Sequence, residues 1–122
     1  MSESLEMYLK VIYTLIEQEE RVHAIDIAKY MHISKPSVSK ALAILKKEEL
    51  VTSVEGRIEL TTQGTKKAQQ ILSKYESIKE FLKQTLQLEE QDACINACRM
   101  EHIITDTCHQ KIEEYLKEQK HD

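Results

Sequence analysis

The sequence predicts a mainly α-helical protein, in which an N-terminal winged helix-turn-helix is followed by a second helical unit. The 122 residues include only two glycines and one proline, a composition that favours helices over a large sheet. Apolar residues recur with helical spacing along most of the chain, whereas residues 51–60 alternate apolar and polar side chains as strands do. This alternating stretch follows three helical segments, which is the order of elements in a winged helix-turn-helix.

The first predicted helix covers residues 5–18, with Ser4 as its N-cap and a single apolar stripe facing the core. Met7 does not belong to this stripe, because the helical repeat turns it about 160° away from the centre of the stripe. The helix therefore carries one methionine whose position packing alone does not explain.

The helix-turn-helix itself is predicted from a short helix over 24–31 and a third helix that begins after Ser34. Residues 51–60 contain the pair Glu55-Gly56, which interrupts the alternation and predicts a two-stranded hairpin, the wing. The distal part continues with helices over 63–86, 89–104 and from 105 to about 117.

These elements divide the chain into two predicted domains. Residues 1–62 would form the winged helix-turn-helix, and residues 63–122 would form a second, helical domain. A chain of this size buries only a small core, so sharing surface with a second copy would stabilise it.

The net charge of −4 does not exclude nucleic-acid binding, because the positive charge is concentrated locally. Residues 29–47 carry five lysines and no acidic residue. A local basic face on an acidic protein is compatible with phosphate binding, although many solvated helices have the same composition.

The start of the third helix is the predicted DNA-reading surface, because serine hydroxyls and lysines there can bond phosphates and base edges. A helix N-terminus also favours phosphate. Arg57, just past the hairpin turn, would reach the neighbouring DNA backbone; the alternative is a winged helix used only for protein contact. The residues predicted at the helix start are Ser34, Lys35, Pro36, Ser37, Ser39 and Lys40.

No signal peptide or membrane span is predicted, because the N-terminus lacks a basic start and no stretch approaches ~20 apolar residues. Three cysteines, two of them one helical turn apart, make a poor disulfide framework. We therefore expect a cytoplasmic protein without a membrane partner. His23, His32 and His121 are expected at the surface.

The stretch 94-CINACRMEH-102 raises a different question. Cys94, Cys98, Glu101 and His102 fall within an arc of about 100° when they are placed on a helix. The motif alone does not decide between an apolar helix that carries two cysteines and one half of a metal site.

Four blocks of the chain resemble the iron-dependent repressors of the diphtheria toxin repressor and manganese transport regulator family. The blocks are SLEMYLKVIYTL, DIAKYMHISKPSVSKALAILKKEELV, RIELTTQG and NACRMEH. The resemblance implies a homodimeric transcriptional repressor, not an enzyme, in which a divalent metal links the first helix to the distal helices. Metal would promote binding to operator DNA that controls metal-homeostasis genes. The resemblance thus implies that residues 1–62 are the DNA-binding domain and that residues 63–122 are the domain for metal binding and dimerisation. Because the chain ends after its last predicted helix, we expect a short form without the family's SH3-like domain.

The resemblance also implies a ligand set of Met7, Cys98, Glu101 and His102 for the primary metal. A thioether, a thiolate, a carboxylate and an imidazole together suit Fe²⁺, which we expect, and also Co²⁺, Ni²⁺ or Zn²⁺, and suit Mn²⁺ less well. Manganese-type members place acidic residues on the first helix, where this chain has Met7 and Lys10.

This chain departs from the family at its accessory metal site. Tyr75 and Lys79 stand where relatives have ligands, so we expect no accessory site of the usual kind. Cys94 either joins the primary site or packs as a small apolar side chain. Whether Cys108 and His109 approach the site is left open.

A second hypothesis is a redox-sensing winged-helix transcription factor that uses Cys94, Cys98 or Cys108. That hypothesis has no use for Glu101 and His102, or for Met7, whereas the metal hypothesis uses all three. A metal-dependent hydrolase is less compatible with the sequence, because no positioned base or nucleophile appears beside the ligands.

Overall fold

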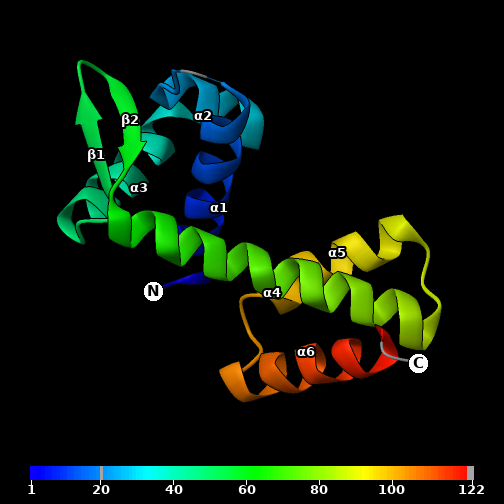
Figure 1. Cartoon of the computed structure of the whole chain (residues 1–122). Helices are drawn as coiled ribbons and strands as arrows, with labels where there is room; N and C mark the ends of the chain where they lie inside the picture. The colour runs from blue at the N-terminus through cyan, green and yellow to red at the C-terminus, as the bar shows by residue number, and fades with distance from the viewer. Residues whose placement is uncertain (20, 121–122) are drawn as a thin grey trace. The chain divides into compact units, whose positions relative to one another are not determined.

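The computed structural model describes residues 1–19 and 21–120, so His121 lies outside the described residues. Its elements follow the predicted order (Figure 1). They are α1 (Glu3–Gln18), α2 (Ala24–Met31), α3 (Lys35–Lys47), β1 (Val51–Val54), β2 (Arg57–Leu60), α4 (Thr62–Leu86), α5 (Glu90–Met100) and α6 (Asp106–Lys120). The mainly helical fold class with a two-stranded wing is confirmed.

The chain forms two compact units, one of residues 1–69 and a second that begins at residue 70. The long helix α4 runs through the junction between them. The division into functional domains 1–62 and 63–122 therefore stays a prediction. No helix in the described part of the chain is long and apolar enough to cross a membrane.

Helix α1 begins two residues earlier than predicted, and Ser2 rather than Ser4 is its N-cap. The Ser2 hydroxyl accepts a hydrogen bond from the Leu5 amide at 3.2 Å. Glu3 and Glu6 then place negative charge in the first turn, where the helix dipole favours it. The apolar stripe packs inward as predicted, with Leu9 and Ile12 fully buried, whereas Met7 is half-buried.

The wing is a hairpin with a two-residue turn, as predicted. Val54 pairs with Arg57 across the turn, and Glu55 and Gly56 both have positive φ, 52° and 81°. Two positive φ values suit a tight hairpin, because that turn matches the twist of the strands. The Ile58 amide also donates to the Val22 carbonyl at 2.7 Å, so the segment before α2 lies along β2.

A short set of backbone contacts joins the end of α3 to the beginning of α4. The Thr61 hydroxyl donates to the Glu49 carbonyl at 2.7 Å and accepts from the Gly64 amide at 3.0 Å. The Gly64 Cα lies so close to the Leu50 carbonyl that an added Cβ would be 2.0 Å from its oxygen. Gly64 is therefore required by close backbone approach.

The second unit is built on its own apolar cluster. Ile78 and Leu82 from α4 pack with Ala93 and Ala97 from α5, and Ile112 comes from α6. Phe81 and Tyr115 stack edge to face with ring centroids 5.3 Å apart. The cluster holds α5 against α4, which positions the candidate ligands.

Gly64→Ala should destabilise the protein by about 1–3 kcal/mol, because the added methyl group would overlap backbone. An exposed helical glycine would show the opposite sign, since alanine is the better helix former by about 1 kcal/mol. Urea unfolding of the variant measures the effect. The exposed neighbour provides a control in Gln63→Ala, and equal stability of Gly64→Ala and the parent would contradict the close approach.

Candidate metal centre and nucleic-acid interface

Among the residues the structure describes, Glu101 is the only charged or polar one that is buried as a whole residue, backbone included, with 1% of its surface exposed. Its carboxylate Oε1 lies 3.1 Å from Nε2 of His102, whose side chain is also buried. Burying a carboxylate in an apolar environment costs free energy unless positive charge or donors compensate it. The surroundings of Glu101 therefore favour a cation or hydrogen-bond donors next to its carboxylate.

The fifth helix is shorter than the predicted span of 89–104. It ends at Met100, and residues 101–104 form turns. Glu101 still keeps helical φ and ψ, and its amide donates to Ala97 at 3.0 Å. The His102 amide instead donates to Arg99 at 3.4 Å, a tighter turn. Glu101 therefore keeps the predicted helical relation to Cys98, and His102 begins the turn.

Cys94 is half-buried and its thiol lies 3.7 Å from Oε1 of Glu90. The Tyr75 hydroxyl is hydrogen-bonded with the same thiol. Burial raises the pKa of Tyr75 most, the hydrogen bond with Cys94 raises it further, and the nearby Cys94, Glu76 and Cys98 add to the effect. Cys94 thus makes polar contacts, and its role as a ligand stays open.

Two lysines of α4 bind the first turn of α5. Lys79 Nζ lies 3.4 Å from Glu76 and 3.4 Å from Glu90, and Lys83 pairs with Glu90. Lys79 also lies 5.4 Å from the centre of the Tyr75 ring. The hydrogen bond and charge of Lys83 are the main reasons why the pKa of Glu90 falls below its ordinary value. The ammonium groups of Lys79 and Lys83 thus supply the positive charge that faces the Glu90 carboxylate.

On α6, Cys108 is exposed and His109 Nε2 lies 3.0 Å from Glu113. Whether Cys108 and His109 approach the metal ligands stays open.

Within the described residues, no three His, Cys, Asp or Glu side chains gather as a group that could hold a metal ion. Cys98, Glu101 and His102 belong to the second unit, and Met7 lies on α1 in the first. Their donor chemistry fits a transition metal, because soft sulfur is combined with imidazole and carboxylate. The four-residue ligand set therefore stays a prediction.

The predicted DNA-reading residues lie at the start of α3, and all six are exposed. Ser34 caps the helix, since its hydroxyl accepts from the Ser37 amide at 3.3 Å and donates to the Ser37 hydroxyl at 2.9 Å. The first turn contains no acidic residue, whereas Lys35 and Lys40 are free to face an anion. The arrangement leaves the positive end of the helix accessible.

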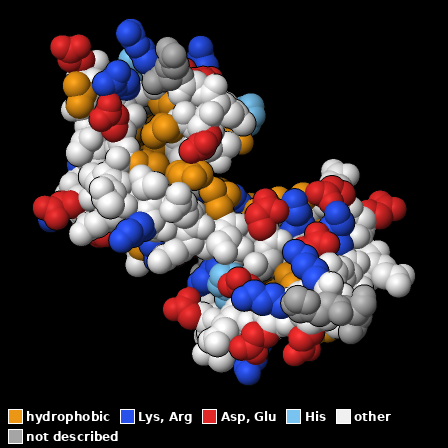
Figure 2. Space-filling model, in the orientation of Figure 1, with side chains coloured by type: hydrophobic (Ala, Val, Ile, Leu, Met, Phe, Trp, Pro, Cys, Tyr) orange, Lys and Arg blue, Asp and Glu red, His pale blue; other side chains and the backbone are white. Residues whose placement is uncertain are grey.

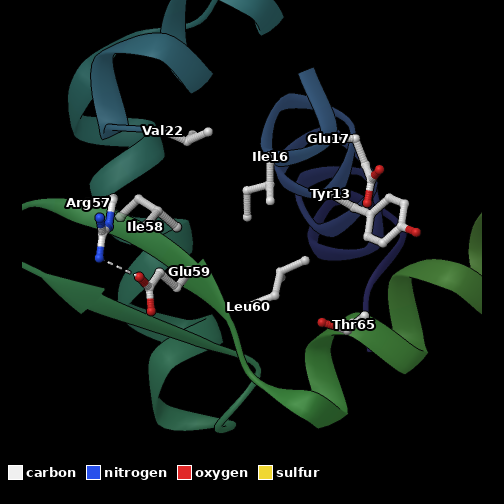
Figure 3. A pocket seen from close by; sticks show the side chains of 9 residues that line it. All are labelled: Tyr13, Ile16, Glu17, Val22, Arg57, Ile58, Glu59, Leu60 and Thr65. Carbon is white, nitrogen blue, oxygen red and sulfur yellow. Dashed lines mark ion pairs between the residues drawn. The ribbon is translucent and has the colours of Figure 1, made fainter. Parts of the chain in front are cut away.

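Arg57 lies on β2 and is paired within the wing. Its guanidinium lies 2.8 Å from Glu59 Oε1, and Figure 3 shows the two side chains turned toward each other. Residues two apart in a strand share one face, which explains the pair. Beside it, a cavity of about 420 Å³ opens between α1 and the wing, with hydrophobic side chains in the hollow (Figure 2). Its lining includes Tyr13, Glu17, Ile16 and Leu60.

Two family models together match nearly the whole chain. Residues 1–57 match the N-terminal DNA-binding domain of the iron-dependent repressors, and residues 61–122 match their metal-binding and dimerisation domain. The fold and the two matched domains define a transcriptional regulator and not an enzyme. The chain belongs to the iron-dependent repressor family.

Relatives support this assignment at two lengths. An uncharacterized HTH-type transcriptional regulator of Methanocaldococcus jannaschii is 34% identical, and the match covers 98% of each chain. The diphtheria toxin repressor of Corynebacterium diphtheriae is 27% identical over 95% of this chain and 52% of its own length. The structure of the manganese regulator SloR is 30% identical with a TM-score of 0.83, covering 96% of this chain and 55% of that one. The chain thus spans about half the length of the latter two proteins.

The Tyr75 contact can be tested by spectrophotometric titration of the five tyrosines. Because its pKa is raised from 10.0, Tyr75 should ionise at higher pH than an ordinary tyrosine. Because the pKa of Tyr75 is higher in the folded state, its contribution to the free energy of unfolding is fully present below the pKa of tyrosine in the unfolded chain. That contribution is lost as the pH rises through the folded-state pKa.

Tyr75→Phe should remove the ionisation step that occurs at the highest pH, which is called the late step below. Tyr30→Phe, which removes an exposed tyrosine, is the matched control and should leave it in place. A late step that survives in Tyr75→Phe would contradict the assigned environment.

Proposed function

We propose that this chain is a metal-dependent transcriptional repressor that binds operator DNA as a homodimer. The observation that carries the proposal is the buried Glu101–His102 pair, located in the domain that follows an exposed, lysine-bearing reading helix. A buried carboxylate beside an imidazole is a reasonable half of a cation site, and the family models name metal binding and dimerisation for this part of the chain. The regulated genes would be those of metal homeostasis.

The ligands of the proposed metal are Met7, Cys98, Glu101 and His102. Fe²⁺ is the metal we expect, although the set also suits Co²⁺, Ni²⁺ or Zn²⁺ and suits Mn²⁺ less well. When bound, the ion would supply positive charge to the buried carboxylate and a bond to each donor. Cys98, Glu101 and His102 come from one stretch of chain, and the side chains of Glu101 and His102 lie 3.1 Å apart. Met7 belongs to the first unit, and its thioether would make metal binding depend on both units.

Operator binding would use the start of α3 in the major groove. Ser39 and Lys40 are exposed there, and the amide groups of the first helical turn favour phosphate. One winged module reads only a half-site, so a two-fold dimer would read two half-sites.

The direct experiment is DNA binding by the purified protein without oxygen, titrated separately with Fe²⁺, Mn²⁺ and Zn²⁺. We expect no tight operator complex without metal and a tight complex with Fe²⁺. An oxidant titration without metal tests the redox alternative, which predicts that DNA binding responds to thiol oxidation alone. A response to oxidant and none to any metal would replace the metal proposal.

His102→Ala should lose most metal binding and, with it, metal-dependent DNA binding, because the imidazole is a proposed ligand. Isothermal titration with metal and a DNA-binding assay measure the two effects. Thr107→Ala removes an exposed side chain of α6 that is not a candidate ligand and serves as the control. Normal metal activation in His102→Ala would contradict the ligand assignment.

Met7→Leu keeps the apolar volume and removes the thioether, so it separates affinity from coupling. We expect this variant to retain part of its metal binding while losing much of the metal's effect on DNA. Typical coupling energies are about 1–3 kcal/mol, and linkage requires DNA to tighten metal binding by the same factor. Unchanged coupling in Met7→Leu would exclude Met7 as the link.

Lys40→Ala should weaken DNA binding without altering metal affinity in the absence of DNA. If Lys40 contacts a phosphate, the salt dependence of binding should fall by about one unit of slope. Fluorescence anisotropy at several salt concentrations measures this, with Lys117→Ala on α6 as the control for lost charge. An unaltered slope would remove Lys40 from the DNA contact.

A further inference from the structure

A second small pocket lies at the tip of the wing, in the first unit. It has a volume of about 140 Å³ and is lined by Arg21, His23, Val54, Glu55 and Arg57. Two arginines and a histidine thus meet at a polar surface pocket, although the sequence separates Arg57 from the other two by more than thirty residues. Such a group of donors suits an anion.

The fold itself brings these residues together. The hydrogen bond from Ile58 to the Val22 carbonyl, 2.7 Å long, lays residues 21–23 along β2. At the turn, a Cβ placed on Gly56 would lie 3.7 Å from Cδ2 of His23. His23 is also the N-cap of α2, so the positive end of that helix is at the same place, although Asp26 in its first turn accepts from the His23 amide.

The Arg57 side chain is only partly used in the observed arrangement. One of its terminal nitrogens pairs with Glu59, whereas its Nε is buried and has no hydrogen-bond partner among the described residues. A guanidinium has five donors in a planar fork, which matches the oxygens of a phosphate. A phosphate in the pocket would provide acceptors for the donors of this partly exposed fork that Glu59 does not use.

We propose that Arg21, His23 and Arg57 form a binding site for one phosphodiester of the DNA backbone, and that Glu59 competes with this phosphate for Arg57. The inference deepens the proposed DNA-binding function and rests on it. The small, polar pocket suits a single phosphate group better than a base and sugar. Its place, on the wing and at the start of the first helix of the helix-turn-helix, is where this motif meets the DNA backbone.

Glu55 and Glu59 set the strength of this site. Glu55 lines the pocket and Glu59 holds the Arg57 guanidinium, so each carboxylate opposes the approach of a phosphate. Only a DNA backbone already held by α3 would present its phosphate at high local concentration. The wing would then add affinity to a correctly placed complex without attracting free anions strongly.

The test measures binding of the metal-loaded protein to operator DNA and to a mixed-sequence duplex over a range of salt concentrations. Arg21→Gln and His23→Gln remove the new residues, and Lys117→Gln on α6 is the charge-matched control. Arg21→Gln should weaken binding to both duplexes by roughly five-fold at physiological salt and lower the salt slope by about one. His23→Gln should weaken binding to the operator and to the mixed-sequence duplex by the same factor.

Glu59→Gln tests the competition directly, with Glu118→Gln as its control. Releasing Arg57 should strengthen binding to both duplexes, and the gain should disappear when Arg57→Gln is added. A neutral Glu59→Gln, or a gain that persists without Arg57, would overturn the role assigned to Glu59.

The outcomes separate this site from the proposed function. If Lys40→Ala weakens DNA binding while Arg21→Gln and His23→Gln match the control, the wing site is wrong and the repressor proposal stands. If the metal-loaded parent does not bind DNA, both fail. If Arg21→Gln changes calorimetric binding of inorganic phosphate but not of DNA, the pocket holds small anions and the backbone-phosphate site is overturned.

Discussion

The burial of the Glu101 carboxylate is the constraint on which the proposed function depends. A charged group that is 1% exposed requires nearby positive charge or hydrogen-bond donors. Its location at the end of α5 follows from the cluster that packs Ala93 and Ala97 against α4. The same packing that stabilises the second unit thus keeps a carboxylate out of water beside an imidazole, which favours a cation more than a solvated carboxylate would.

For metal binding to change DNA binding, the ion must also affect the first unit, which carries α3. A metal bound only by Cys98, Glu101 and His102 could leave α3 unaffected, because all three residues belong to the second unit. A ligand on α1 changes this, since α1 packs against α2, α3 and β2. In the proposed ligand set, the methionine that lies off the apolar stripe of α1 would link metal binding to DNA binding. Arg57 and its neighbours would then tune the strength of the resulting complex.

The sequence predicted the features that depend on local preference. The helix order follows from apolar periodicity, and the hairpin follows from Glu55-Gly56, whose positive φ values are confirmed. The N-cap at Ser4 was wrong, because Ser2 and Ser4 are chemically equivalent candidates and packing decides between them. The end of α5 was placed too late, because the backbone tightens after Met100, where the His102 amide donates to the Arg99 carbonyl.

The polar clusters could not be predicted in the same way. The Tyr75–Cys94 contact and the Lys79–Glu90 pair join different helices, so no spacing within one helix reveals them. Arg21 and His23 were likewise missed, since only the pairing of Val22 with β2 brings them to Arg57. Spacing indicated Cys98, Glu101 and His102 as metal ligands, and the family resemblance added Met7, so the complete ligand set stays a prediction.

X-ray absorption spectroscopy of the Fe²⁺-loaded protein bound to DNA would identify the atoms that bind the metal. We expect sulfur together with nitrogen and oxygen in the first coordination sphere. We also expect Cys98→Ser and Met7→Leu each to reduce the sulfur contribution, whereas Cys108→Ser should leave it unchanged. A coordination sphere of oxygen and nitrogen alone, with DNA binding intact, would contradict the proposed ligand set.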